Sequence, residues 1–187
     1  VIYDNSDLIS SCRCWYNFIY FGHNPKLVHV LNGGLKKWKM ENKILTKEIA
    51  SINKSNYSAQ ENLELVKNKE QINKNILNKE FDLVDARSKG RFQGKEPEPR
   101  KNMKSGNIKN SFNVPYDLLI NEDHTFKSKQ EIKNIFEKNI KSNLKDDIVF
   151  SCGSGVTAAV LALAYSLINN KYAPKLYDGS WAEYGKI

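Results

Sequence analysis

The sequence predicts an α/β fold with a mainly parallel central sheet flanked by helices. Short β-branched and aromatic runs alternate with segments of helical periodicity, which is the order that crossover helices between parallel strands require. The 187 residues suffice for one well-packed domain, or for one domain and a piece of another. Hydrophobic residues make up 40% and charged residues 27% of the chain, which is ordinary for a soluble globular protein.

The first part of the chain is expected to hold two strands, two helices and a linker. Residues 1–4 (VIYD) and 27–31 (LVHVL) predict strands, whereas 11–21 (SCRCWYNFIYF) predicts a helix. The stretch 31–38 (LNGGLKKW) predicts a glycine turn that runs into a short helix. Residues 42–60 are polar and show no sustained period, so we expect a linker there.

Residues 61–187 carry the pattern of a whole α/β domain. Apolar residues recur at helical spacing between 61 and 80 and predict one helix or two short ones. Glycines, prolines and charges between 88 and 107 predict a long structured loop. Strands are expected at 81–87, from 110 to a turn at Pro115, at 147–151 and at 175–179, and helices at 130–139, from Gly155 and from Ser180.

An internal repeat bears on the domain organisation. VIYDN…LVHVLNGGLKKW and IVFSC…PKLYDGSWAEY share one order of elements: strand, loop, helix, strand, glycine turn and short helix. Asn5 lies 28 positions before Gly33, and Cys152 lies 27 positions before Gly179. Nothing before the first copy matches 81–147. We therefore expect residues 1–41 to be the C-terminal part of an incomplete first domain, 42–60 a linker, and 61–187 a second domain.

Charge and hydropathy argue against two classes of partner. The net charge is +8, but the lysines are scattered among Asn and Glu, so we expect no nucleic-acid partner and a field that attracts small anionic substrates. No apolar run reaches the ~18–20 residues that cross a bilayer, so we expect no membrane span. The chain begins VIYD without a charged leader, so we expect no targeting segment and expect upstream residues to have been removed.

The three cysteines do not form a disulfide framework. Cys12 and Cys14 alternate along one element and point apart, so we expect packed thiols and neither a disulfide nor a metal site. Such a cysteine content fits a reducing compartment, cytoplasmic or mitochondrial.

The third cysteine lies in IVFSCGSGVTAAV (148–160), between an expected strand and an expected helix. A thiol attacks as the thiolate, so a reactive cysteine needs a local positive potential. Glycines let the loop curl, so that backbone N–H groups and the helix N-terminus can point at Cys152. Gly153 and Gly155 give the loop its glycines, and Ser154 and Thr157 carry hydroxyl donors. Val156 begins the apolar run of a helix that is expected to be buried.

This loop admits three interpretations. A free cysteine at a strand end is commonly no more than a small apolar residue. A cysteine phosphatase needs an arginine about six residues after the thiol to clamp the phosphoryl group. Here that position is Ala158, and no basic residue occurs between Cys152 and Lys171. A loop that cradles a thiolate or persulfide without a phosphate clamp favours sulfur transfer.

With these residues the sequence resembles the rhodanese superfamily and, within it, the tandem-domain 3-mercaptopyruvate sulfurtransferases. The loop CGSGVT (152–157) is typical of that group, whereas thiosulfate-using rhodaneses usually carry basic residues in it. Further blocks follow in family order, from the first copy to the C-terminus: LNGGLKKW (31–38), VDAR (84–87), GRFQG (90–94), EPEPR (96–100), SGNIKNSFNVP (105–115) and YDGSWAEYG (177–185).

The resemblance implies a sulfurtransferase that moves sulfur from 3-mercaptopyruvate through a persulfide on Cys152 to thioredoxin, cyanide or another thiol acceptor. It implies a rhodanese-like catalytic second domain and a non-catalytic first domain, and Asn5 stands where the second copy has Cys152. No cofactor and no metal are expected. Thiosulfate sulfurtransferase activity stays open as an alternative, as does an inactive rhodanese-like module that carries sulfur or binds proteins.

The resemblance also assigns roles to single residues. Arg91 and Arg100 match the arginines that hold the carboxylate and carbonyl of mercaptopyruvate, work for which the planar guanidinium is suited. Ser154 matches a serine thought to take part in proton transfer with the thiol. Arg87 is expected in a structural ion pair, and Asp85 and Asp178 are expected to cap turns.

The chain departs from the family at two places. Asn107 replaces the histidine of a Gly-His-Ile block, which we interpret as a surface or packing change. The family's Asp and His that complete the proton relay belong to the front of the first domain, outside this chain. None of His23, His29 and His124 is assigned that role, so we expect an incomplete site.

Overall fold

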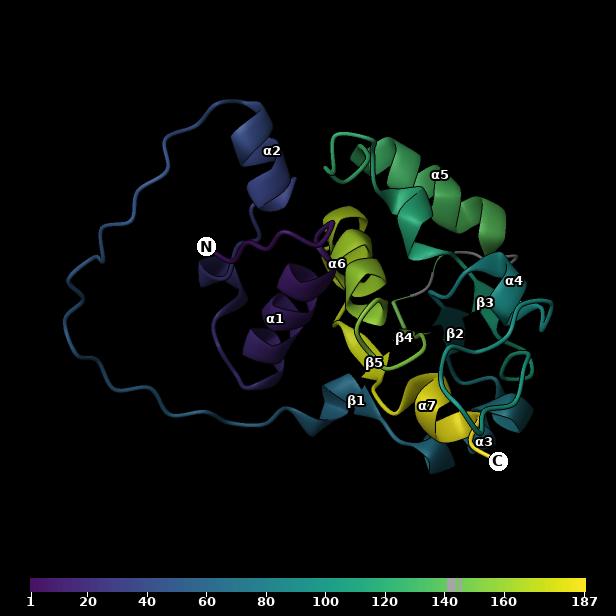
Figure 1. The fold of residues 1–187 in the computed structure, drawn as a ribbon. Helices are drawn as coiled ribbons and strands as arrows, with labels where there is room; N and C mark the ends of the chain where they lie inside the picture. Colours follow the sequence, from purple (N-terminus) through teal and green to yellow (C-terminus); the bar gives the residue numbers. More distant parts are fainter. Residues whose placement is uncertain (141–143, 145) are drawn as a thin grey trace.

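The computed structural model, which describes residues 1–140, 144 and 146–187, contains a five-stranded sheet in which every strand pair is parallel (Figure 1). This confirms the predicted α/β class. The strand order is β1-β5-β4-β2-β3. The strands are β1 (Val66–Lys67), β2 (Asp82–Asp85), β3 (Phe112–Asn113), β4 (Ile148–Ser151) and β5 (Lys175–Tyr177).

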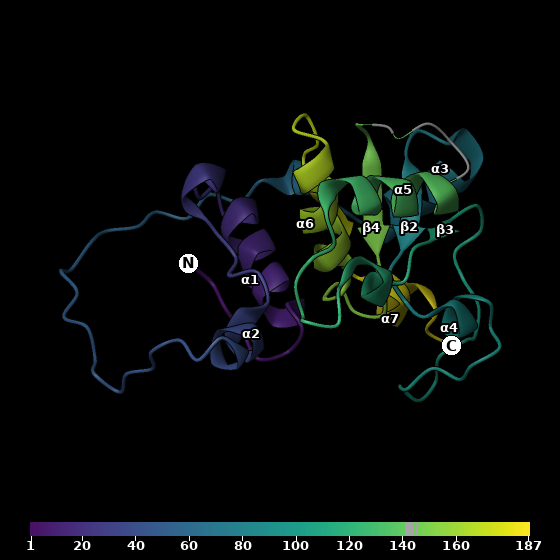
Figure 2. The ribbon, with the colours of Figure 1, turned by 90° about the horizontal axis from the view of Figure 1, so that it is seen from above.

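Helices cover both faces of the sheet because alternate strand residues point to opposite sides (Figures 1 and 2). Val84 and Phe150 pack with α5 (Lys129–Asn139) and α6 (Ala158–Ile168). Leu83 and Val149, one position earlier on the same strands, pack with α3 (Lys69–Asn78) and α7 (Ser180–Tyr184). The remaining short elements are α4 (Lys89–Phe92), η1 (Pro25–Leu27), η2 (Leu63–Leu65) and η3 (Tyr116–Leu119).

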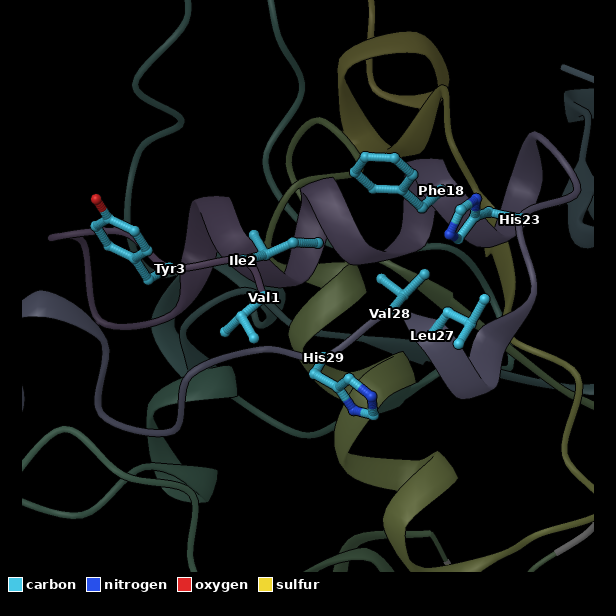
Figure 3. A pocket seen from close by; sticks show the side chains of 8 residues that line it. All are labelled: Val1, Ile2, Tyr3, Phe18, His23, Leu27, Val28 and His29. Atoms are coloured by element: carbon cyan, nitrogen blue, oxygen red, sulfur yellow. The ribbon is translucent and has the colours of Figure 1, made fainter. Parts of the chain in front are cut away.

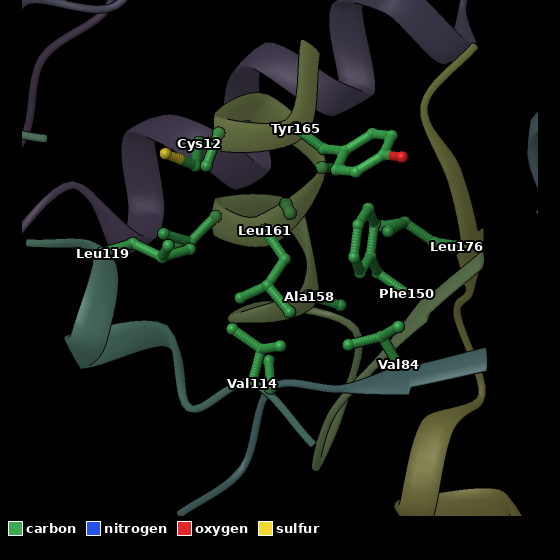
Figure 4. Close-up of a cluster of buried hydrophobic side chains, with 14 of the residues drawn as sticks. Cys12, Val84, Val114, Leu119, Phe150, Ala158, Leu161, Tyr165 and Leu176 are labelled. Carbon is green, nitrogen blue, oxygen red and sulfur yellow. The ribbon is translucent and has the colours of Figure 1, made fainter. Parts of the chain in front are cut away.

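Helix α6 lies at the centre of the core, as the apolar run at its start predicts. Figure 4 shows it between α1 (Ile9–Tyr20), which contributes Cys12, and the sheet, which contributes Phe150 and Leu176. Its residues Ala158–Ala162 are each 0% exposed. The loop before α6 is therefore attached to a helix whose first residues are completely buried.

The strands expected at 1–4 and 27–31 are wrong. The two segments meet in a single parallel bridge between Ile2 and Val30, with hydrogen bonds from Ile2 N–H to His29 O (2.7 Å) and from Leu31 N–H to Ile2 O (2.8 Å). Within the described residues no third strand pairs with this bridge, so the ladder does not extend. The helices predicted beside it are present, as α1 and α2 (Gly34–Met40).

Between 61 and 80 the chain forms two short helices, η2 and α3, which is one of the two expected arrangements, but an unexpected strand separates them. This strand is β1, which the helical spacing concealed. Helix α3 begins only after Asn68, whose side chain accepts the Gln71 N–H (2.9 Å) while the Gln71 side chain accepts the Asn68 N–H (2.9 Å). The helix expected from Gly155 begins at Ala158, since Gly155 has a φ of 76°, outside the right-handed helical region.

Residues 1–41 pack against elements formed by residues 61–187. Trp15 and Tyr16 of α1 are buried in the same apolar cluster as α6, and Lys37 of α2 pairs with Asp123 (2.8 Å). Residues 43–60 form no helix or strand and run as a long arc (Figures 1 and 2), which returns to the end of α1 where Tyr57 and Gln60 donate to the Phe21 carbonyl. No helix among the described residues is long and apolar enough to cross a bilayer.

Candidate active site

The predicted site residues lie at the point in the sheet where the strand order reverses. From β2 the chain continues to β3 on one side, and from β4 it continues to β5 on the other, so the carboxyl ends of β2 and β4 flank a switch point. Ligands of open parallel sheets bind at such points. Cys152 directly follows β4, and the segment after β2 carries Arg91 and Arg100. Arg91 lies in α4, a short helix within the stretch 88–107 where only a loop was expected.

The cysteine loop is held from outside by the start of α7. The carbonyl of Cys152 accepts the Trp181 N–H, and the carbonyl of Gly153 accepts the Ala182 N–H, both at 2.9 Å. Carbonyl and N–H of a trans peptide unit point in opposite directions. These bonds therefore turn the N–H groups of the following residues to the other side of the loop.

Ser180 anchors the loop from inside. Its hydroxyl accepts the N–H groups of Cys152 (3.1 Å) and Gly155 (3.0 Å) and donates to the Tyr177 carbonyl (2.8 Å). The residue is completely buried. The sequence contains this serine in the YDGSWAEYG block, but nothing local to the block indicates that it contacts a loop 25 residues earlier.

The thiol is buried within its own loop. Cys152 is 1% exposed, and its Sγ accepts the Ser154 N–H at 3.4 Å. The side chains of Ser154, Val156 and Thr157 are half-buried, and Thr157 lies at the start of α6 without making a side-chain cap. The sulfur atom thus contacts one amide of its own loop, that of Ser154.

Both predicted substrate arginines reach this loop. A Cβ on Gly153 would lie 3.0 Å from Arg91 Nη2 and 3.6 Å from Arg100 Nη1, so glycine leaves room for the guanidiniums. Arg100 Nη1 donates to the Gly153 carbonyl at 3.4 Å. Two cationic groups therefore lie beside the residue that follows the thiol.

A buried carboxylate holds Arg91 in place. Glu98 accepts from Arg91 Nη2 (2.6 Å) and Nε (3.2 Å), and from Arg87 Nη1 (2.8 Å). The Glu98 side chain is only 3% exposed. Burial alone raises the pKa of Glu98, but the hydrogen bonds and charges of Arg91 and Arg87 outweigh it and leave that pKa below its usual value.

The expected structural ion pair of Arg87 is confirmed. Its guanidinium, 0% exposed, binds Asp85 Oδ2 (2.6 Å), and its carbon Cζ lies 4.4 Å from the ring centre of Trp181. Asp85 also caps the turn, as expected, by accepting the Arg87 N–H at 2.9 Å. Asn107 is exposed and donates to the Phe92 carbonyl (2.9 Å), which agrees with a surface change.

The expectation that Asp178 caps a turn is wrong. Its carboxylate pairs with Arg13 of α1, whose Nη1 also donates to the Gly155 carbonyl at 3.1 Å. Sequence inspection missed Arg13 because it lies between two cysteines on an expected helix, 142 positions before its partner in the loop.

The three histidines make their recorded contacts elsewhere. His124 Nδ1 lies 2.7 Å from Asp7 Oδ1, and the His23 ring lies edge-on to Phe18 and tilted against Tyr57. His23 and His29 line a cavity of about 460 Å³ on the N-terminal segment, together with Val1, Ile2, Tyr3, Phe18, Leu27 and Val28 (Figure 3). This cavity contains neither cysteine nor arginine, so it carries none of the predicted chemistry. No group of three metal-ligating side chains occurs within the described ranges.

The fold and the site together define a parallel α/β domain with one cysteine loop at its switch point. The model of the rhodanese-like domain matches residues 68–186, and the chain belongs to this family.

Curated relatives match almost the whole chain. It is 38% identical over 186 residues to 3-mercaptopyruvate sulfurtransferase of Homo sapiens, covering 98% of this chain and 61% of that protein. It is 39% identical over 187 residues to thiosulfate sulfurtransferase of Rattus norvegicus, covering 98% of this chain and 62% of that protein. The chain thus spans about three fifths of the length of these relatives.

Solved structures share the fold. The crystal structure of SseA from Escherichia coli, described as a 3-mercaptopyruvate sulfotransferase, superposes with a TM-score of 0.76 at 31% identity, covering 96% of this chain and 65% of that one. The Tum1 protein of Saccharomyces cerevisiae gives a TM-score of 0.80 at 28% identity, covering 97% and 64%.

Proposed function

We propose that this protein is a sulfurtransferase that takes sulfur from 3-mercaptopyruvate and passes it, as a persulfide on Cys152, to a thiol acceptor. The observation that carries the proposal is a cysteine loop with Ala158 in place of a phosphate-clamping arginine, and with Arg91 and Arg100 beside Gly153. The sulfurtransferase activity of the curated relatives supports it.

The proposed first step is nucleophilic. The Cys152 thiolate attacks the sulfur of mercaptopyruvate, an S–S bond forms, and the C–S bond breaks with its electron pair going to carbon. That carbon takes up a proton and leaves as pyruvate, while Cys152 keeps one sulfur atom as a persulfide. A thiol acceptor then attacks the outer sulfur, which returns the electron pair of the S–S bond to Cys152.

In the proposed reaction the loop stabilises the sulfur anion, and the arginines bind the donor. The amides near the sulfur stabilise the anionic thiolate and persulfide, and Ser154 supplies a hydroxyl for proton transfer. Arg91, oriented by Glu98, and Arg100, whose recorded contact is one long hydrogen bond, bind the carboxylate and carbonyl of the keto acid. Gly153 leaves space for both guanidiniums.

Two alternatives are kept. Identity to a thiosulfate sulfurtransferase is as high as identity to a mercaptopyruvate enzyme, which favours thiosulfate as the competing donor. Burial of the Cys152 thiol, 1% exposed, favours the other alternative, a rhodanese-like module without turnover.

The domain organisation is part of the proposal. Residues 1–41 are the C-terminal part of a non-catalytic first rhodanese domain, 42–60 the linker, and 61–187 the catalytic domain. Support comes from the internal repeat, from the isolated bridge between Ile2 and Val30, and from exposed apolar side chains such as Tyr3 and Leu27. Thioredoxin or another thiol in a cytoplasmic or mitochondrial compartment is the proposed acceptor.

The donor test uses the whole chain. Incubation with 3-mercaptopyruvate should add about 32 Da, one sulfur atom, to the peptide containing Cys152 and leave those of Cys12 and Cys14 unchanged, as read by mass spectrometry. Pyruvate in place of the donor is the control. Faster loading from thiosulfate would favour the thiosulfate alternative, and no adduct from either donor would favour the inactive module.

Removing the Arg100 guanidinium should weaken donor binding. Arg100→Ala is expected to raise the KM for mercaptopyruvate about tenfold to a hundredfold, the worth of a charge-assisted hydrogen bond. The neighbouring exposed Lys101→Ala removes the same charge and should leave KM nearly unchanged. If both variants raise KM equally, the weaker binding reflects the overall positive field of the protein, and Arg100 does not bind the donor directly.

A further inference from the structure

The N-terminal segment touches the cysteine loop through one side chain. Arg13 Nη1, from α1, donates to the Gly155 carbonyl (3.1 Å) and pairs with the carboxylate of Asp178, which follows β5. One guanidinium thus joins three parts of the chain: the first-copy segment, the loop, and the turn before α7.

The contact is closely packed. Gly155 adopts a φ of 76°, and a Cβ on it would lie 2.9 Å from Arg13 Nη1 and closer still to Asp178 Oδ1. The Arg13 guanidinium carbon lies 5.5 Å from the ring centre of Tyr16, whose hydroxyl donates to the Leu65 carbonyl at 2.8 Å. Helix α1, packed on α6, therefore presents Arg13 to the loop from a fixed position.

Fixing the Gly155 carbonyl also sets the direction of an amide. In a planar trans peptide the N–H of Val156 points opposite to the Gly155 carbonyl. The carbonyls of Cys152 and Gly153 are likewise held, by α7, and the N–H that follows Gly153, that of Ser154, reaches the sulfur. In the part of the chain that the structure describes, the Val156 N–H has no recorded acceptor.

We propose that Arg13 is a positioning residue for the Cys152 loop: it holds the Gly155 peptide in the orientation that leaves the Val156 N–H available to the sulfur anion. The inference rests on the proposed function for its catalytic consequence. Without Arg13 the Gly155 peptide can rotate, because glycine tolerates many backbone conformations. The residues before the linker then act on catalysis through this contact, without touching the substrate.

The test compares Arg13→Met with Lys37→Met in the whole chain. Both changes remove a cation that links residues 1–41 to the second domain, but Lys37 binds Asp123 instead of the loop. Hydrogen exchange of the peptide that contains residues 152–157 should be faster in Arg13→Met and unchanged in Lys37→Met. In sulfur transfer, Arg13→Met should lower kcat about 10- to 100-fold with little change in KM, as expected for misplaced catalytic groups.

Arg13→Lys should recover part of the protection of the loop from exchange and part of kcat. This variant also keeps the test possible if Arg13→Met does not fold. Unchanged loop exchange in Arg13→Met, equal losses in both methionine variants, or faster exchange with wild-type kcat would each overturn the proposal. If the wild-type chain takes sulfur from neither donor, the proposed function fails, while loop exchange still decides whether Arg13 holds the loop.

Discussion

Cys152→Ser is expected to abolish sulfur transfer, with a loss of more than about 10³-fold in kcat, because a hydroxyl oxygen cannot carry sulfur as a persulfide. The substitution changes one buried atom, and the loop's backbone hydrogen bonds to Ser180 and α7 do not involve the sulfur. The fold should therefore persist. Steady-state turnover with mercaptopyruvate and the mass of the Cys152 peptide measure the effect.

Cys14→Ser makes the same change at a half-buried cysteine outside the loop and should retain wild-type turnover. Cys12 is no alternative nucleophile, since burial raises the pKa of its thiol above the ordinary value and keeps it protonated. Residual transfer above a tenth of wild type in Cys152→Ser, or its loss in Cys14→Ser, would place the sulfur carrier elsewhere.

Arg87→Met should be strongly destabilising, with a loss on the order of 3–5 kcal/mol in the free energy of unfolding. The reason is that two carboxylates, Asp85 and Glu98, are each 3% exposed and lose a shared guanidinium partner. Chemical denaturation at neutral pH measures the loss. Lys89→Met, an exposed cation two residues away, is the matched control and should change stability little.

Measuring the stability of wild type and Arg87→Met at low pH tests whether the loss comes from carboxylates that lack a partner. The folded-state pKa of Glu98 lies below its usual value, so its stabilising contribution is present above the unfolded pKa of about 4.3 and is lost as the pH falls through the folded value. Protonated Glu98 no longer needs a cationic partner. The stability difference between wild type and Arg87→Met should therefore narrow below about pH 4, and a constant difference would mean that packing alone is lost.

Much of the fold could be predicted because it depends on local pattern. The buried strand β4, the loop after it and the apolar helix α6 follow one another in the sequence with unmistakable hydropathy. The errors concern strands, because pairing between distant segments decides whether a strand forms. Strand β1 has two residues and exists only because β5 lies beside it, whereas the bridge between Ile2 and Val30 has no further strand to pair with in the described residues.

The candidate site likewise has some features that the sequence predicted and others that only the structure revealed. The sequence by itself determined which chemical groups the proposed site contains: one cysteine in a glycine loop, Ala158 in place of a phosphate clamp, and two arginines after β2. Only the tertiary structure decided what holds that loop, namely Ser180 from within and Arg13 from 142 positions upstream. The physical reason is that a nucleophilic loop is a local backbone pattern, while the groups that orient its peptides come from whichever surfaces pack against it.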